Sequence, residues 1–160
     1  MFEINLVCVG TLHEGYWQQA CAEYVKRLTG RCRLTVTEIT EQRLPSAPSP
    51  AQIAAGLDAE ASKILPLLER SAFCAALCVE GGQLSSQLLA QRLSELMVHG
   101  TSSASFVIGG SFGLSQRVKQ RADLLLSMSD MTFPHQLARV MLCEQLYRAF
   151  TILGGEKYHK

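Results

Sequence analysis

Hydrophobic and polar positions alternate with two different periods along the 160 residues, and the period predicts where strands and helices lie. Short apolar or alternating runs rich in β-branched residues are typical of strands, and they occupy residues 2–9, 31–39, 72–79, 105–108 and 124–128. Apolar residues at helical spacing predict helices over residues 13–29, 51–70, 84–99 and 136–153, with a short one ending near residue 122. Strands that alternate with helices predict an α/β fold with a mainly parallel sheet of about five strands.

The helix predicted over residues 136–153 differs from the others because apolar side chains surround it almost completely. A helix that is apolar all round is buried on more than one side, so we expect its second side to pack against another subunit. Pro134 suits the first turn of this helix, and Thr132 just ahead is a candidate for its N-cap. Glu144 and Arg148 have the spacing of a local ion pair, and the sequence leaves open whether that pair also has a function.

Two stretches interrupt the periodic pattern. Residues 44–50 are rich in Pro and Ser and are expected to form a mobile surface loop. Because this stretch is too short and too early in the chain to divide two domains, we expect residues 1–160 to form a single domain. The sequence Glu80-Gly81-Gly82 is expected to end the third strand.

Composition narrows the class of protein. A hydrophobic content of 48% and a charged content of 18% are typical of an ordered globular chain. No apolar run is long enough to span a membrane, and the first residues lack the features of an export signal. The six cysteines are scattered without the spacing of a metal site, which favours reduced thiols in a cytoplasmic protein and no bound metal.

Charge neither demands nor excludes a nucleic-acid partner. The formal net charge is only +1, which argues against a strong non-specific binder of nucleic acid. Residues 135–160 nevertheless carry an excess of arginine and lysine over glutamate. If RNA is the substrate, its shape and a composite protein surface must provide much of the recognition.

Three predicted loops follow strands and are candidates for a ligand site, because ligands of parallel α/β sheets bind beyond the carboxyl ends of the strands. They are residues 79–82, 109–113 and 129–134. Any one of them alone is more often a tight turn, but three together favour a small-molecule pocket. The motifs G-x-G-x-x-G and G-K-[ST] are absent, and the glycine loop at 109–113 contains no Lys or Arg. The predicted pocket therefore fits an uncharged nucleoside, such as the adenosine part of S-adenosylmethionine, better than a polyphosphate.

The end of the chain resembles one bacterial family. Residues 134–140 read PHQLARV, residues 144–149 read EQLYRA, and the chain ends in Tyr158-His159-Lys160. These runs resemble the signature of the SPOUT-class methyltransferases that modify N3 of a pseudouridine in large-subunit ribosomal RNA, the RlmH family. The resemblance covers nearly the whole chain and is dense from Gly109 onward.

The resemblance implies an α/β-knot fold with a C-terminal trefoil knot, a homodimer, S-adenosyl-L-methionine as cofactor and large-subunit rRNA, within the ribosome, as substrate. It also implies a set of cofactor-binding residues: Leu77, Gly109, Gly110, Ser129, Asp130, Met131, Thr132, Phe133 and Pro134. Two positions depart from the family pattern. Cys78 replaces a usual acid, and Lys157 replaces a frequent proline.

Methyl transfer to an imide-type nitrogen requires alignment of donor and acceptor and removal of a proton. The candidate catalytic residues are His135, Arg148, Tyr158 and His159. The two histidines titrate near neutrality and are candidate bases, although His135 is equally expected to bond only within its own helical turn. The C-terminal tail, Tyr158-His159-Lys160, has residue types that suit stacking on a flipped base and binding of phosphate. The alternative is a disordered tail, which is the default for a chain terminus.

Arg139 and Arg148 could hold RNA or brace a dimer, and we favour bracing for Arg139. A non-catalytic ribosome- or RNA-binding module with the same fold is the main alternative to an enzyme, and a flavodoxin-like nucleotide-binding domain is a third hypothesis.

Overall fold

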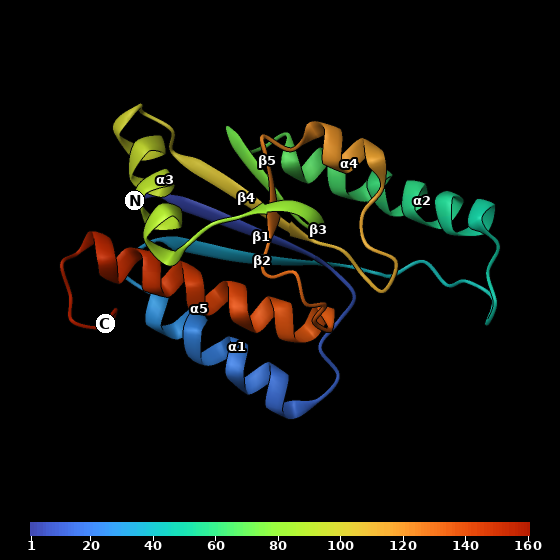
Figure 1. The fold of residues 1–160 in the computed structure, drawn as a ribbon, viewed down its shortest axis with the longest axis horizontal. Coiled ribbons are helices and arrows are strands. Elements are labelled where there is room, and N and C mark those ends of the chain that lie inside the picture. The colour runs from blue at the N-terminus through green and yellow to red at the C-terminus, as the bar shows by residue number, and fades with distance from the viewer.

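The computed structural model describes all 160 residues and contains one five-stranded sheet. The strands follow the order β2-β1-β4-β3-β5, and all neighbours pair in parallel (Figure 1). The strands are β1 (Glu3–Val9), β2 (Arg33–Ile39), β3 (Phe73–Gln83), β4 (Ser103–Ile108) and β5 (Leu124–Ser127). The helices are α1 (Gly15–Leu28), α2 (Pro50–Leu68), α3 (Ser86–Val98), α4 (Gln116–Arg121) and α5 (His135–Leu153).

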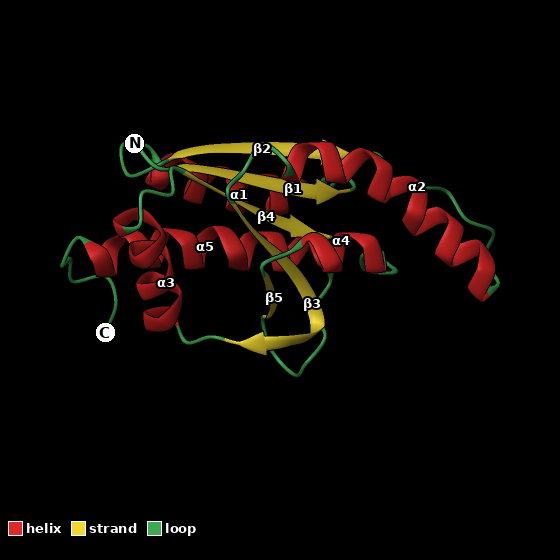
Figure 2. Ribbon diagram, turned by 90° about the horizontal axis from the view of Figure 1, so that it is seen from above, coloured by secondary structure: helices red, strands yellow, loops and turns green.

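Helices cover both faces of the sheet (Figure 2). Helices α1, α3 and α5 pack on one face, and α2 and α4 pack on the other. Strand β1 shows why, because successive side chains of a strand point to opposite faces. Its residues Ile4 and Leu6 belong to the core under α5, whereas Val7 and Val9 belong to the core under α2. The parallel α/β architecture predicted from periodicity is therefore confirmed.

The predicted end of β3 is wrong. The strand does not stop at Glu80 but bends and continues to Gln83, so that Leu126 of β5 is paired first with Leu77 and then with Gly82. A Cβ on Gly81 would lie 2.6 Å from the backbone of Leu125. The two glycines do not end the strand, because the missing side chain at Gly81 lets β3 cross β5 in close contact.

The predicted starts of the helices 51–70 and 136–153 need small corrections, since α2 begins at Pro50 and α5 at His135. Ser49 and Gln52 form a capping box with Pro50 at the first helical position, so the end of the predicted loop belongs to α2. Pro134 itself is the N-cap of α5, and no side chain caps this helix. Thr132 is therefore not the N-cap, because it lies two residues too early. None of the helices combines the length and apolar character required to cross a membrane.

Candidate functional site

A hollow of about 700 Å³ lies where β3, β4 and β5 end. That volume is within the range of small-molecule sites. Eight of the nine residues predicted to bind the cofactor line this hollow: Leu77, Gly109, Gly110, Ser129, Met131, Thr132, Phe133 and Pro134. The structure therefore brings together segments from three separate parts of the chain at the edge of the sheet predicted for ligand binding.

Asp130 is the exception among the nine. Its carboxylate does not line the hollow but accepts a hydrogen bond of 2.7 Å from the Gln83 amide at the end of β3. This contact ties the loop at 129–134 to the bent part of β3. In this structure Asp130 therefore shapes the loop and does not face the hollow.

The loop at 129–134 offers backbone donors. Its turn is stabilised by the Ser129 hydroxyl, which accepts a hydrogen bond of 3.0 Å from the Met131 N–H. The N–H groups of Asp130, Thr132 and Phe133 have no acceptor in the protein. Free backbone donors beside an apolar wall suit the polar edge of a planar heterocycle.

The glycine loop is a tight turn in which Gly110 and Gly113 form an isolated bridge. A side chain on Gly109 would overlap the backbone of Gly113, and one on Gly110 would overlap the carboxylate of Glu41. Gly113 has φ +80°, a conformation that favours glycine. Gly109 and Gly110 are therefore required because other atoms lie close to their backbone, and Gly113 is favoured by its left-handed conformation.

The residues around the hollow offer no unpaired Lys or Arg side chain to bind a phosphate. Lys119 is its only Lys or Arg, and its ammonium group is paired with Glu80. That ion pair holds the pKa of the Glu80 carboxyl below its usual value. Burial raises the pKa of the Cys78 thiol, so this residue is neutral at pH 7. An uncharged adenosyl group fits this lining, and no group of three or more His, Cys, Asp or Glu in the chain is arranged to hold a metal.

His135 lies at the first position of α5 and lines the same hollow. Its Nε2 atom is 3.7 Å from the point that a Cβ on Gly10 would occupy. The ring therefore packs beside Gly10, just after β1, and it does not form the hydrogen bond to its own turn that the sequence left open. A half-buried imidazole at the mouth of a ligand hollow is geometrically available for proton transfer.

Arg139 does not have the role that the sequence favoured. Its side chain is only 5% exposed and donates to Glu38 Oε1 at 2.5 Å and to the Gly10 carbonyl at 2.9 Å. Both partners belong to the same chain. Because the guanidinium is buried inside the protomer, it can neither hold RNA nor brace a dimer, and instead it joins α5 to the ends of β1 and β2.

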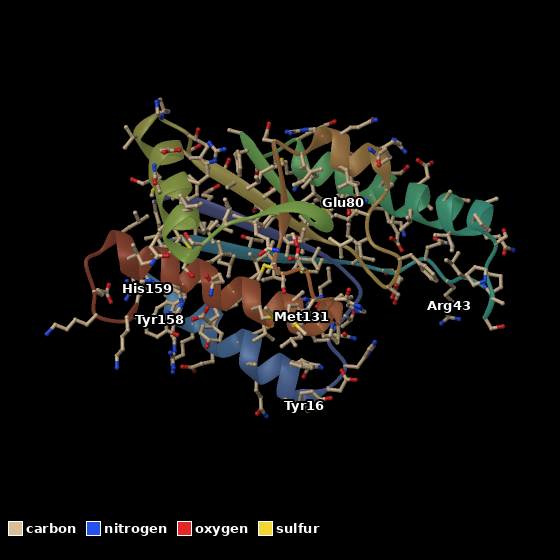
Figure 3. The ribbon with its side chains drawn as sticks, in the orientation of Figure 1. Tyr16, Arg43, Glu80, Met131, Tyr158 and His159 are labelled. Atoms are coloured by element: carbon tan, nitrogen blue, oxygen red, sulfur yellow. The ribbon has the colours of Figure 1, made fainter.

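The other predicted catalytic residues form a cluster around the C-terminal tail, at the far end of α5 from Met131 (Figure 3). Arg148 donates to Glu144 at 3.0 Å, which confirms the local ion pair, and its guanidinium lies 4.7 Å from the centre of the Tyr158 ring. The Tyr158 hydroxyl donates to the same carboxylate at 3.1 Å. Burial, followed by this hydrogen bond, raises the pKa of Tyr158 to about 12, so the phenol is neutral at pH 7.

His159 is also held in this cluster. Arg148 Nη1 lies 3.3 Å from Nδ1 of His159, and the Gln87 amide lies 2.7 Å from Nε2. Since a guanidinium can only donate, Nδ1 of His159 accepts the hydrogen bond from Arg148. The tail is thus bonded to α3 and α5, although its sequence gives disorder as the default.

A second hollow of about 490 Å³ lies between the first one and the tail cluster. The two share Leu126, Ser127 and Met128 at the end of β5. Ala138 lines the first hollow and Glu144 the second, and the six helical steps from one to the other correspond to about 9 Å along the helix axis. Within one protomer, the tail cluster and the predicted cofactor residues therefore occupy opposite ends of one groove.

Two residues near the site were not predicted from the sequence. Glu41 accepts a hydrogen bond of 3.0 Å from the Ser111 N–H in the glycine loop, and Gln87 contacts His159. Glu41 lies in a polar segment after β2, and Gln87 lies in the first turn of α3. No local pattern distinguishes them from other exposed polar residues, because both contacts join segments about 70 residues apart in sequence.

The sequence was compared with known proteins. The family described as predicted SPOUT methyltransferase matches residues 2–159. A protein of Carboxydothermus hydrogenoformans named Ribosomal RNA large subunit methyltransferase H is 45% identical over 158 residues, which cover 99% of each chain. A protein of the same name from Bifidobacterium animalis subsp. lactis is 46% identical over 157 residues, covering 98% of this chain and 99% of that protein.

Solved structures share the fold at low sequence identity. A probable methylase family protein from Haemophilus influenzae has a TM-score of 0.60 and 14% identity, covering 98% of this chain and 70% of that one. A probable methyltransferase from Bordetella pertussis has a TM-score of 0.60 and 13% identity, covering 93% and 95% of the two chains.

Proposed function

The chain belongs to the SPOUT methyltransferase family, and from this membership and the site we propose an S-adenosylmethionine-dependent enzyme that methylates N3 of a pseudouridine in large-subunit ribosomal RNA. The observation that carries the proposal is the hollow at the ends of β3, β4 and β5, which is lined by eight of the nine residues expected to bind the cofactor. Action on ribosomal RNA also agrees with the cytoplasmic location expected from the sequence.

The residues of the hollow fit S-adenosylmethionine. Leu77, Ile108 and Phe133 provide apolar surface for the adenine, and the free N–H groups of Thr132 and Phe133 provide donors for its ring nitrogens. The cofactor supplies a methyl group already activated on a sulfonium, so the protein has to bind, align and exclude water.

His135 is the better placed of the two candidate bases. It lines the hollow and its ring has no hydrogen-bond partner in the protein, whereas both ring nitrogens of His159 face partners in the tail cluster. We therefore assign removal of the N3 proton to His135 and binding of the target nucleotide to Arg148, Tyr158 and His159. A neutral phenol and a guanidinium stacked on it suit contact with a flipped base and its phosphate.

A homodimer would bring the candidate base His135 close to the residues of the tail cluster. One face of α5 carries Val140 and Met141, which line the second hollow and are only half-buried in the protomer. In a two-fold dimer formed through this face with its axis perpendicular to α5, the two α5 helices run antiparallel. The tail of one copy then faces the cofactor hollow of the other, so that each active site contains residues of both copies.

The surface around the tail suits RNA. Lys26, Lys157 and Lys160 are exposed and take part in no ion pair. Beside them, the Tyr147 ring lies 5.8 Å from the Arg27 guanidinium and 5.2 Å from that of Arg31. Arg27 and Arg31 are each paired with a glutamate, so the three lysines are the free cations of this surface. Exposed cations and aromatic rings are typical of surfaces that contact phosphates and bases. The trefoil knot expected of the family is part of the proposal.

Methyl transfer from radiolabelled S-adenosylmethionine tests the proposal. The substrates are ribosomes from a strain that lacks this activity, with naked rRNA as the comparison. We expect labelled N3-methylpseudouridine with the wild-type protein and loss of at least about a hundredfold in rate with His135→Ala. Calorimetry of S-adenosylmethionine binding distinguishes the enzyme from the alternative, because a non-catalytic module binds ribosomes but not S-adenosylmethionine. A folded protein that binds ribosomes and transfers no methyl group would contradict the proposal.

A further inference from the structure

Glu41 links the segment after β2 to the glycine loop of the cofactor hollow. Its Oε1 atom accepts a hydrogen bond of 3.0 Å from the Ser111 N–H, and the same carboxylate lies where a side chain on Gly110 would be. One half-buried carboxylate therefore fixes two successive residues of the loop. Hydrogen bonds between a carboxylate and a backbone N–H are stronger than those between neutral groups.

The backbone next to Glu41 is anchored in α2. The Gln42 N–H donates to Oε1 of Glu60 at 2.9 Å, and Glu60 is only 6% exposed. Leu44 packs on α2 at Gly56, where a Cβ would lie 3.0 Å from the leucine methyl group. Because the chain that follows it is held at two points on α2, Glu41 can hold the glycine loop in one place.

The second carboxylate oxygen and the His135 ring both lie beside Gly10. Oε2 of Glu41 lies 3.9 Å, and Nε2 of His135 lies 3.7 Å, from the point that a Cβ on Gly10 would occupy. Gly10 has φ +92°, so this position favours glycine, and the absence of a side chain leaves room for both groups. Glu41 is thus bonded to the cofactor loop and lies near the same glycine as the candidate base.

We propose that Glu41 is a positioning residue that holds the glycine loop, through the Ser111 N–H, in the conformation that binds S-adenosylmethionine. The inference rests on the proposed function. A loop already ordered before binding does not lose conformational entropy when the cofactor binds, so its anchor contributes to affinity without touching the cofactor.

The test compares Glu41→Ala and Glu41→Gln with the control Glu14→Ala, which removes an exposed carboxylate without a hydrogen-bond partner. Exchange of the Ser111 amide is measured by NMR in the cofactor-free protein. Affinity for S-adenosylmethionine is measured by calorimetry, and KM and kcat are measured with ribosomes.

We expect Glu41→Ala to expose the Ser111 amide to exchange and to weaken cofactor affinity about tenfold or more, with kcat at saturating cofactor within about twofold of the wild type. Glu41→Gln keeps an acceptor oxygen and is expected to stay within about threefold of wild-type affinity. A merely structural role would lower the melting temperature of Glu41→Ala without this change in affinity of the folded protein.

Two results would overturn the inference. One is cofactor affinity of Glu41→Ala equal to that of Glu14→Ala. The other is an equal loss in Glu41→Gln and Glu41→Ala, which would mean that charge, and not the hydrogen bond, is responsible. If the wild-type protein itself fails to bind S-adenosylmethionine, the proposed function fails, whereas faster Ser111 exchange in Glu41→Ala would still establish the contact.

Discussion

Gly81 and Gly82 are neighbours in β3, but only Gly81 lies against another strand. A Cβ on Gly81 would meet the Leu125 backbone at 2.6 Å, whereas nothing lies within 4 Å of one on Gly82. Backbone atoms in a paired strand cannot move aside cheaply. We expect Gly81→Ala to lower the free energy of unfolding by about 2 kcal/mol or more, and Gly82→Ala to change it by less than about 0.5 kcal/mol.

Urea denaturation of the two variants checks this difference. Because the substitution is the same and the positions are adjacent, helix and strand propensities cancel in the comparison. Equal stability of the two variants would mean that β3 does not cross β5 as closely as described. Cofactor affinity, measured in parallel, is expected to fall only in Gly81→Ala, since the crossing shapes one wall of the hollow.

Glu60 is a buried carboxyl whose pKa is raised by burial, although the Gln42 N–H partly offsets the effect. The folded state therefore binds this proton more tightly than the unfolded state does. The corresponding stability is present below the unfolded pKa of the group and is lost as the pH rises through the raised value. Glu60→Gln, which cannot ionise, is expected to gain stability relative to the wild type as the pH rises from 4 to 7.

Urea denaturation at a series of pH values measures this slope, and Glu69→Gln is the control because Glu69 is exposed. The wild type and the control are expected to show the same pH dependence. A constant difference between the wild type and Glu60→Gln across the range would mean that Glu60 titrates alike in the folded and unfolded states.

Single residues were predictable from the sequence where a local rule applies. The glycines at 109, 110 and 113 and the loop at 129–134 follow strands, and the rule that ligands bind beyond parallel strands placed them in one site. Glu41 and Glu60 follow no such rule. Their roles arise from contacts with distant segments, and their surroundings in sequence are those of ordinary surface acids.

Arg139 shows how a charge inside an apolar helix can stabilise the arrangement of elements. Its buried guanidinium joins α5 to β1 through the Gly10 carbonyl and to β2 through Glu38. Removing the guanidinium leaves the Gly10 carbonyl without this donor and leaves Glu38, whose side chain is 38% exposed, without its ion pair. We expect Arg139→Met to lower the free energy of unfolding by about 2 kcal/mol.

The matched control is Arg92→Met, which removes an exposed arginine whose ion pair with Glu95 is 3.7 Å long. This exposed pair is expected to contribute less than about 1 kcal/mol. Thermal and urea unfolding of both variants provide the comparison. If Arg139→Met is as stable as Arg92→Met, the guanidinium does not hold α5 to the sheet.

At the scale of elements, periodicity predicted all five strands and all five helices. It failed at the end of β3, because a glycine pair usually ends a strand and only the position of β5 allows this strand to continue. It also misplaced Arg139, since an isolated arginine on an apolar helix suits a subunit interface as well as a buried contact. In both cases the deciding contact lies outside the local sequence.

At the scale of the whole molecule, the proposed active site is divided between two ends of α5. The cofactor residues lie near its beginning and the tail cluster beyond its middle (Figure 3). If an antiparallel dimer joins them, two variants that are each inactive can complement one another. Thr132→Trp fills the cofactor hollow at an exposed position, and Tyr158→Ala removes the ring of the tail cluster.

A heterodimer of these two variants, purified through two different affinity tags, contains one site with both defects and one site with neither. It is expected to methylate ribosomes at about half the rate of the wild-type dimer, although each parental homodimer is inactive. The heterodimer of wild type and Tyr158→Ala is the control and is expected to have the same rate. If the site were formed within one protomer, every site of the mixed dimer would carry one defect, and no activity would return. A monomer in sedimentation at working concentration would contradict the shared site directly.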